Sequence, residues 1–183
     1  MNMKEEYAIV LDFLATGYPG RRYGEPLAQA IGKDYFSLLE LVSKENIILK
    51  QGEEVYIGDE KRDKIKLVKR RLRLSDLTNI ALSNLKEFLD QLIEKNEKRF
   101  VDFFNTASSI TPRLHKFELL PGIGKKYAQA LINHRPFTSF EDIKNKTGIS
   151  DLVKIIKKRI LDELSGNEKY YIFVVPVRTF HGR

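Results

Sequence analysis

The sequence predicts an α+β protein in which a small β-barrel or sandwich precedes an all-α domain. Short β-leaning runs fill the first 74 residues, between turns rich in Gly and Pro. Apolar residues between Leu77 and Ile93 then recur at helical spacing, and short helical segments with tight glycine turns follow. The expected boundaries are 1–74 for the β domain, 75–105 for connecting helices, 106–166 for the all-α domain and 167–183 for a C-terminal strand and tail.

The composition indicates a basic globular protein. Hydrophobic residues make up 42% of the 183 residues, which is enough for real cores, and the net charge is +7. Such an excess usually meets nucleic acid or an anionic membrane surface, and the alternative is a solvated face. The absence of cysteine excludes disulfides, a zinc ribbon and a thiol nucleophile. No run approaches the ~18 apolar residues of a membrane helix, so we expect a soluble, cytoplasmic protein without a membrane partner.

The β domain is expected to contain four or so strands and a helix. A strand at Glu5–Leu14 leads into a loop that carries Arg21 and Arg22. The remaining expectations are one or two short helices over 26–44, a hairpin of two strands around Gln51-Gly52, and a strand over Asp63–Leu74 with a bulge near Leu67–Val68.

Two helices should follow. Ser75 is the expected N-cap of a helix over 76–95. The next helix places Phe100, Phe103 and Phe104 on its apolar side, where we interpret them as core residues rather than as a platform for base stacking. At the far end, residues 170–177 have the pattern of a lone strand. Because one strand is not stable alone, we expect it to pair with the N-terminal sheet.

The stretch "LLPGIGKKYAQALINHR" is the most informative one. Gly122, Ile123 and Gly124 form a tight turn directly ahead of a helix that begins with Lys125 and Lys126. The first amides of a helix have no partners and carry partial positive charge, so a phosphate is their natural ligand. Ile123 should point inward. The preceding "PRLHKFELL" should supply a first helix, and the alternative is a plain C-cap glycine turn.

A second, less complete copy of this pattern follows. Residues 140–146 predict a helix, Gly148 lies in the turn, and Ser150 is the expected N-cap of a helix that ends at Leu164. The second glycine is missing, so phosphate contact by this copy is an open question. Lys154, with Lys157 and Lys158, could supply the missing charge or could simply be solvated.

These segments resemble the tandem helix-hairpin-helix, which binds duplex backbone without reading sequence and in some members holds a monovalent cation. The whole chain also resembles an uncharacterised archaeal domain-of-unknown-function family, on "AIVLDFL", "QAIGKDYFSLLELV", "VYIG", "NEKRFVDFFNTASSITPRLHKFELLPGIGKK" and "FTSFEDI". That resemblance implies an OB-like N-terminal barrel and no enzymatic activity. The family's genes tend to lie among translation genes, which favours RNA and association with the ribosome.

A second basic segment lies between Lys61 and Arg73, with eight Lys or Arg residues and one Asp. On a barrel edge this strand could follow a phosphate backbone, and lysine-rich edges also protect against aggregation. We favour binding because the charge density exceeds what edge protection needs. The expected contacts of this region are Lys69, Arg70, Arg71 and Arg73, joined by Arg21 and Arg22.

An enzymatic function is not expected. Lys126 and Asp142 match the lysine and aspartate that follow the hairpin in some base-excision glycosylases, but those enzymes need a large all-helical domain for a flipped base. His115, His134 and His181 are scattered, and no clustered carboxylates suit two metal ions. We therefore expect a nucleic-acid-binding protein without a cofactor and with structured RNA favoured. The alternatives are a DNA-binding accessory protein in repair or recombination and a protein-interaction adaptor, and the oligomeric state stays open.

Overall fold

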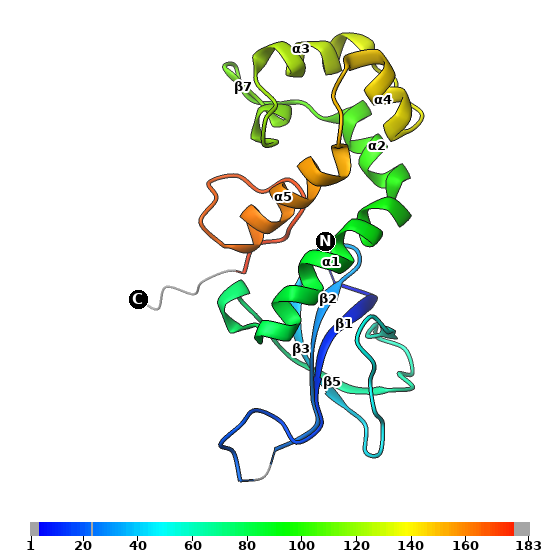
Figure 1. The fold of residues 1–183 in the computed structure, drawn as a ribbon, viewed down its shortest axis with the longest axis vertical. Helices are drawn as coiled ribbons and strands as arrows, with labels where there is room; N and C mark the ends of the chain where they lie inside the picture. Colours follow the sequence, from blue (N-terminus) through cyan, green and yellow to red (C-terminus); the bar gives the residue numbers. More distant parts are fainter. Residues whose placement is uncertain (1–3, 23, 178–183) are drawn as a thin grey trace. The chain divides into compact units, whose positions relative to one another are not determined.

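The computed structural model describes residues 4–22 and 24–177 (Figure 1). The chain forms two compact units. The first contains the described residues up to Phe88 together with those from Glu163 onward, and the second is Leu89–Asp162. The architecture is α+β, as expected, with a five-stranded antiparallel sheet followed by helices.

The sheet has the strand order β4-β1-β2-β3-β5, and every neighbouring pair is antiparallel. The core on the inner face of the sheet contains Val10, Ala30 and Leu41, which are fully buried. No pairing joins β4 to β5 in the described part of the chain, so the sheet is a half-barrel. Its strands are β1 (Tyr7–Leu14), β2 (Leu27–Gly32), β3 (Leu38–Ser43), β4 (Glu54–Tyr56) and β5 (Ile65–Arg71).

The expected helices over residues 26–44 are wrong. This segment forms the β2–β3 hairpin, in which Leu27 pairs with Val42 and Ile31 pairs with Leu38. All six residues of each strand are buried, so neither strand alternates between apolar and polar residues. Leucine and alanine in such a run also favour a helix locally, and the pairing of the strands overrides that preference.

The other strand expectations hold in part. The turn at Gln51-Gly52 is present and Gly52 has a φ of +83°, but only Glu54–Tyr56 forms a strand beside it. Leu49 precedes the turn as an irregular core residue. The β3–β5 register has two irregularities, at Lys66 and at Lys69, where one bulge between them was expected. The irregularity at Lys66 places Ile65 and Val68, which pair with Ser43 and Leu41, on the same face, while Leu67 is exposed.

The connecting helices are a 3-10 turn, η1 (Leu74–Asp76), and two α-helices, α1 (Asn79–Lys95) and α2 (Glu97–Thr106). Ser75 is not the N-cap of α1, because η1 intervenes. Thr78 takes that place, and its hydroxyl accepts the Ala81 N–H at 3.0 Å and donates to Asp12 at 2.7 Å. Phe100 and Phe104 are fully buried, which confirms that they are core residues.

The second unit continues with a short hairpin of β6 (Ser109–Thr111) and β7 (Leu114–His115) and with the 3-10 turn η2 (Lys116–Leu119). The α-helix expected over "PRLHKFELL" is therefore wrong. Leu114, Phe117 and Leu120 are spaced by three, a spacing that a 3-10 turn satisfies as well as an α-helix does. The His115 side chain caps η2 by accepting the Phe117 N–H at 3.1 Å.

The remaining helices are α3 (Lys125–His134), α4 (Phe140–Thr147) and α5 (Leu152–Leu164), close to the expected ranges. Ser150 is not the N-cap of α5. The first backbone bond of that helix runs from the Ile155 N–H to the carbonyl of Asp151, which has a φ of +55°.

The strand expected over 170–177 is also wrong, because the described residues up to Val177 form no strand there. Phe173 and Val174 are nonetheless buried in the first unit. The Glu163 carboxylate accepts three consecutive backbone N–H groups, from Ile172, Phe173 and Val174, at 2.7–3.0 Å. A buried side chain thus supplies the acceptors that a neighbouring strand would have supplied.

Candidate nucleic-acid interface

The turn ahead of α3 has the geometry expected from its glycines. Gly122 has a φ of +79°, which favours glycine strongly. Ile123 is 5% exposed and points into the second unit, as expected. Gly124 is the N-cap of α3, with φ −90° and ψ −172°.

The start of α3 presents donors and charge to solvent. The N–H groups of Gly124, Lys125 and Lys126 have no backbone acceptor among the described residues, as in any first helical turn. Both lysine side chains are exposed, and in the described part of the chain neither forms an ion pair. Tyr127 is also exposed, at 41%. Free amides, the helix dipole and two free cations are therefore combined at one surface turn.

Neither packing nor backbone strain requires glycine at position 124. Its φ is negative, and a Cβ built on it would meet no atom within 4 Å. The absence of a side chain leaves the following amides open to close approach from solvent. A ligand's backbone could contact these amides directly.

The second hairpin differs in kind. Gly148 has a φ of +76° and is the C-cap of α4, and its N–H donates to the Lys144 carbonyl at 2.8 Å. Lys157 pairs with Asp90 at 2.9 Å and Lys158 with Asp162 at 3.3 Å, which leaves exposed Lys154 beside them. The hollow in front of α5 is lined by four carboxylates. They belong to Asp90, Glu94, Glu141 and Asp151. Lys144 and Lys154 also line the hollow, but the acidic groups outnumber them, and this excess of negative charge disfavours a phosphate.

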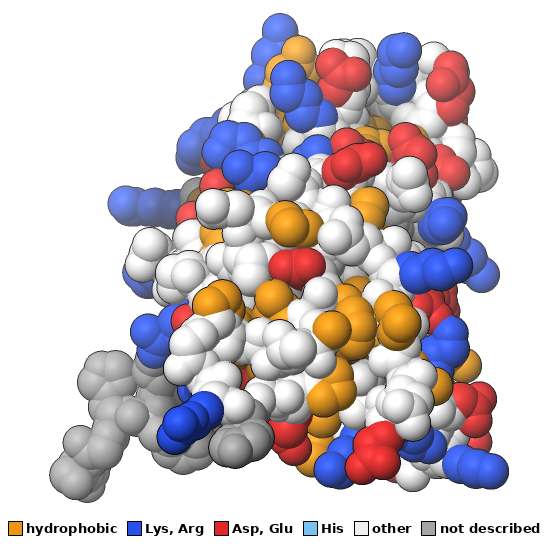
Figure 2. Space-filling model, turned by 60° about the horizontal axis from the view of Figure 1, so that its bottom comes forward, with side chains coloured by type: hydrophobic (Ala, Val, Ile, Leu, Met, Phe, Trp, Pro, Cys, Tyr) orange, Lys and Arg blue, Asp and Glu red, His pale blue; other side chains and the backbone are white. Residues whose placement is uncertain are grey.

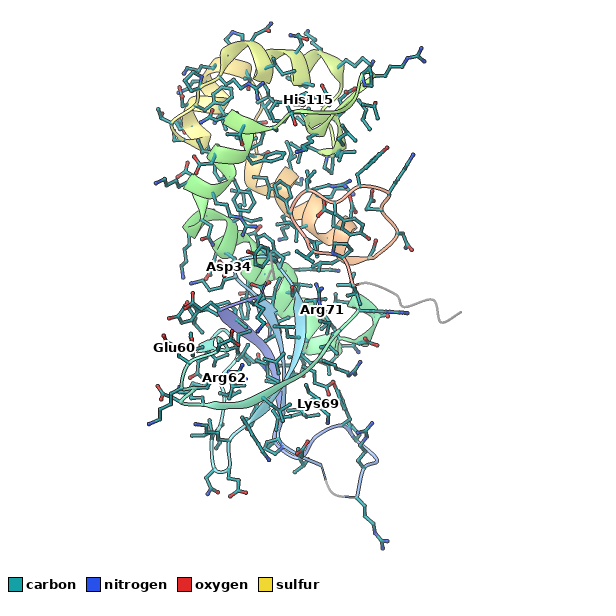
Figure 3. The ribbon with its side chains drawn as sticks, turned by 180° about the vertical axis from the view of Figure 1, so that it is seen from behind. Asp34, Glu60, Arg62, Lys69, Arg71 and His115 are labelled. Atoms are coloured by element: carbon teal, nitrogen blue, oxygen red, sulfur yellow. The ribbon has the colours of Figure 1, made fainter. Side chains whose placement is uncertain are left out.

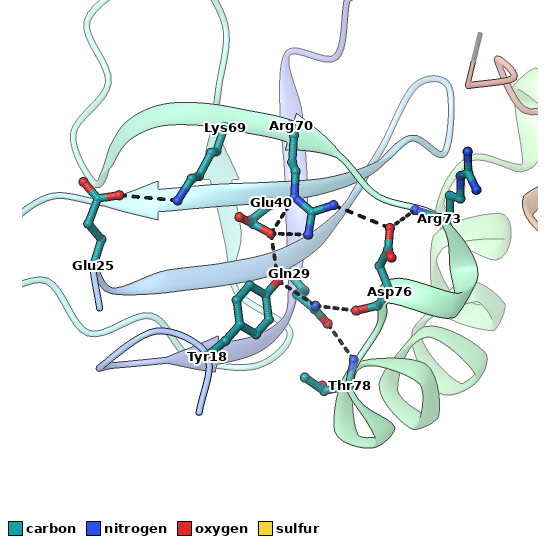
Figure 4. Close-up of polar contacts among 9 residues, drawn as sticks. All are labelled: Tyr18, Glu25, Gln29, Glu40, Lys69, Arg70, Arg73, Asp76 and Thr78. Atoms are coloured by element: carbon teal, nitrogen blue, oxygen red, sulfur yellow. Dashed lines mark hydrogen bonds and ion pairs between the residues drawn. The ribbon is translucent and has the colours of Figure 1, made fainter. Parts of the chain in front are cut away.

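Most of the basic residues of β5 are engaged within the first unit (Figure 4). Lys69 lies 3.5 Å from Glu25. Arg70 lies 3.0 Å from Glu40, a carboxylate whose side chain is 2% exposed, and 3.6 Å from Asp76. Glu40 also accepts the Tyr18 hydroxyl at 2.8 Å. Burial raises the pKa of Tyr18, so this hydroxyl stays protonated and donates.

The last two basic residues of this segment, Arg71 and Arg73, differ in their surroundings. The Arg71 guanidinium is half-buried and donates to the Ser37 hydroxyl at 3.1 Å and to backbone carbonyls of Val175 and Pro176. The Arg73 side chain is exposed. Of the four expected contacts on this segment, Arg73 is therefore the most accessible to an outside phosphate.

Arg21 and Arg22 are exposed on the β1–β2 loop, which closes tightly at its base. A Cβ on Gly24 would come within 1.7 Å of the Thr16 carbonyl oxygen, so only glycine fits there. Tyr18 then attaches the loop to the sheet through Glu40 and Gln29. The fold thus holds both arginines out from the sheet on a closed loop.

His115 is the clearest perturbed group of the second unit. It is a strand-end cap rather than the helix residue that the sequence predicted, and its ring lies 4.5 Å from that of Phe117. Burial, and then the charge of Arg135, lower its pKa. The Asp142 carboxylate contacts Lys146 and the Thr138 N–H, each at 3.0 Å, and so stabilises the start of α4. The described residues contain no cluster of three or more metal-ligating side chains.

The surface charges are mixed over much of the protein. On the face in Figure 2, Lys and Arg side chains are interspersed with Asp and Glu side chains, and hydrophobic side chains lie between them. The described part of the chain contains no helix long and apolar enough to cross a membrane. The net charge of +7 therefore does not by itself locate an interface.

Comparisons with known proteins show which family the chain belongs to. Residues 4–175 match the family model "Protein of unknown function (DUF655)", and the chain belongs to that family. It is 45% identical to the uncharacterized protein MJ0038 of Methanocaldococcus jannaschii over an alignment of 175 residues that covers 93% of this chain and 80% of that one. It also resembles the crystal structure of Af1531 from Archaeoglobus fulgidus, a DUF655 protein. The TM-score is 0.84 at 42% identity, over 93% of this chain and all of that one. The expected archaeal family of unknown function is confirmed.

Proposed function

We propose that the protein is a non-enzymatic nucleic-acid-binding protein that holds phosphate backbone at the N-terminus of α3 without reading sequence. The proposal rests on the geometry and exposure of Gly124, Lys125 and Lys126. An uncrowded glycine cap, open amides and two unpaired lysines form one exposed turn. Amides at a helix N-terminus and nearby cations are the usual ligands of a phosphate.

The proposal includes an OB-like fold for the first unit and a tandem helix-hairpin-helix for the second. The order β4-β1-β2-β3-β5 supports an OB-like barrel that is open between β4 and β5. The glycine turn, α3, α4 and α5 support a tandem helix-hairpin-helix whose first helix is replaced by η2. In such a protein the first hairpin would bind phosphate. The second would serve packing, because acidic residues surround it.

The first unit would add a second contact. Arg21, Arg22 and Arg73 are the expected cations there that are exposed and form no ion pair among the described residues. Lys69, Arg70 and Arg71 would hold the fold together instead, because each already has partners in the first unit. Structured RNA, including ribosomal RNA, is the favoured ligand, and duplex DNA is the alternative. A protein-interaction adaptor is the third reading, and it requires no contact with phosphate.

The test is a salt titration of binding to matched duplex RNA, duplex DNA and single-stranded RNA, with the wild-type chain and the double variant Lys125→Ala, Lys126→Ala. We expect the double variant to weaken binding to all sequences alike and to lower the salt slope by about two units. The matched control is Lys157→Ala, since Lys157 is paired with Asp90. Unchanged affinity in the double variant would show that the hairpin is structural, and no binding at low salt would leave the adaptor reading.

A further inference from the structure

A cavity of about 450 Å³ opens at the seam between β4 and β5, where the half-barrel is not closed. We call it the seam cavity. All of its lining residues belong to the first unit, so its chemistry can be considered without reference to α3. Its volume lies within the ~300–1,000 Å³ typical of small-molecule sites.

The floor of the seam cavity is apolar and one wall is aromatic. Leu39 and Ile57 are buried, and Val68 is partly buried beside them. The aromatic lining residue is Tyr56, whose ring packs edge-to-face against that of Tyr7 at a centroid distance of 5.3 Å and whose hydroxyl accepts the Glu60 N–H at 3.1 Å. A Cβ on Gly58 would come within 2.4–2.8 Å of that ring, so glycine is needed for the ring to lie there. A fixed aromatic wall above an apolar floor suits a flat ring.

Two guanidinium groups, those of Arg62 and Arg71, line the seam cavity and give it positive charge. Figure 3 labels both residues. Arg62 belongs to the connection after β4, and its Nε donates to the Gly58 carbonyl at 2.8 Å. Arg71 lies on β5, and its Nε is buried without an acceptor among the described residues. In that part of the chain no carboxylate forms an ion pair with either arginine. The terminal nitrogens of Arg71 donate to Ser37, Val175 and Pro176. The charge of the two guanidinium groups would attract an anionic group to the cavity.

Burial lowers the pKa of Arg71, and the nearby charge of Glu5 opposes this without forming an ion pair. Glu5 accepts the backbone N–H groups of Asp34, Tyr35 and Ser37 at 2.8–3.0 Å, so its lone pairs are engaged. Asp59 pairs with Lys4 at 3.2 Å and is largely exposed, and Glu6 is exposed beside it. These two acidic groups disfavour a ligand with many negative charges. They would instead accept hydrogen bonds from hydroxyl or amino groups.

We propose that the seam cavity binds one nucleotide. The base would lie on Leu39, Ile57 and Val68 beside Tyr56, and the phosphate would contact Arg62, with the charge of Arg71 adding long-range attraction. The ribose hydroxyls and the base amino groups would donate to the acidic rim. A free mononucleotide and an unpaired nucleotide of a nucleic-acid strand share this chemistry. The inference does not depend on the hairpin at α3.

The test is calorimetric titration of the full chain with each of the four ribonucleoside 5′-monophosphates, beside the nucleosides and inorganic phosphate. At least one monophosphate should bind about ten-fold or more tightly than its nucleoside and than phosphate. Val68→Phe fills the floor and Arg71→Gln removes a charge, and each should weaken that binding at least ~ten-fold. The control on the same strand is Lys69→Gln, which should bind as the wild type does.

Two further measurements distinguish a free nucleotide from a nucleotide within a strand, and the seam cavity from the hairpin at α3. Competition by a single-stranded RNA hexamer would assign the seam cavity to a nucleotide within a strand, and its absence would assign it to free nucleotides. Lys125→Ala with Lys126→Ala should leave the monophosphate affinity unchanged, so failure of one site is distinguishable from failure of the other. The inference is overturned if no monophosphate binds at millimolar concentration, or if binding survives both Val68→Phe and Arg71→Gln in variants that melt cooperatively.

Discussion

Arg70 holds the buried carboxylate of Glu40 at 3.0 Å, across the β3–β5 pair of the half-barrel. Glu40 also accepts the hydroxyl of Tyr18, which attaches the loop carrying Arg21 and Arg22. A residue counted as a surface cation in the sequence is thus a partner of a buried anion. The relationship separates basic residues that stabilise the fold from those left to meet a ligand.

The first prediction concerns this pair. Arg70→Gln leaves Glu40 buried with less compensation, and we expect the free energy of unfolding to fall by about 1–3 kcal/mol, since Arg70 itself is half-exposed. Lys66→Gln is the matched control on the same strand and should change it by less than ~0.5 kcal/mol. Urea denaturation of both variants gives the comparison. Equal stabilities would show that the pair contributes nothing.

The second prediction uses the two hairpin glycines as a matched pair. Gly124→Val adds a side chain where a Cβ meets no atom, so the fold should keep its stability within about 1 kcal/mol. The added bulk should nevertheless weaken nucleic-acid binding about ten-fold or more, because it blocks close approach to the amides. Gly148→Val occupies a left-handed position and should cost roughly 1–2 kcal/mol of stability.

Affinity measurements and thermal melts of both glycine variants show whether each turn contacts the ligand or only supports the fold. The proposal expects Gly124→Val to be folded and weak in binding, and Gly148→Val to be less stable and to bind normally once folded. Equal binding losses in the two variants would indicate that both hairpins contact the ligand. Normal binding by Gly124→Val would remove the site from α3.

The third prediction is a pH dependence of stability that comes from His115. Because its pKa is lowered in the folded protein, the unfolded chain binds more protons than the native one as the pH falls below the ordinary histidine value of about 6.5. This contribution is complete above that value and is lost as the pH falls through the folded pKa. His115→Asn keeps a capping acceptor for the Phe117 N–H and should flatten the dependence below the ordinary histidine value of about 6.5.

Denaturation curves at a series of pH values test this, with His134→Asn as the control at an exposed histidine. The control should retain the slope of the wild type. If the slope persists in His115→Asn and disappears in His134→Asn, the assignment to His115 is wrong.

The fourth prediction concerns Glu163, whose buried carboxylate accepts the N–H groups of Ile172, Phe173 and Val174. Glu163→Ala would leave these amides without that acceptor and should cost about 2–4 kcal/mol. Glu163→Gln keeps one carbonyl oxygen and should cost less. Hydrogen exchange should show faster exchange of residues 172–174 in Glu163→Ala, while unchanged protection there would contradict the role of the carboxylate.

The hairpin at α3 and most helices could be predicted from local sequence, because the glycine turn and the 3.6-residue apolar period are short-range signals. The β2–β3 hairpin could not. Its residues are buried on both faces, so they lack the alternation that marks a strand. The first helix of the hairpin motif failed for a related reason, since a spacing of three residues fits η2 as well as an α-helix.

The sequence by itself determined the family, the α+β class, the turn at Gly122–Gly124 and the excess of positive charge. Only the tertiary structure decided which cations have partners. Lys69 meets Glu25 of the β1–β2 loop, Arg70 meets Glu40 across the β3–β5 pair, and Arg71 meets the carbonyl of Val175. It also decided that Glu163 replaces a strand and that β4 and β5 leave a cavity. These outcomes depend on groups brought together from distant positions, and local propensity carries no information about such encounters.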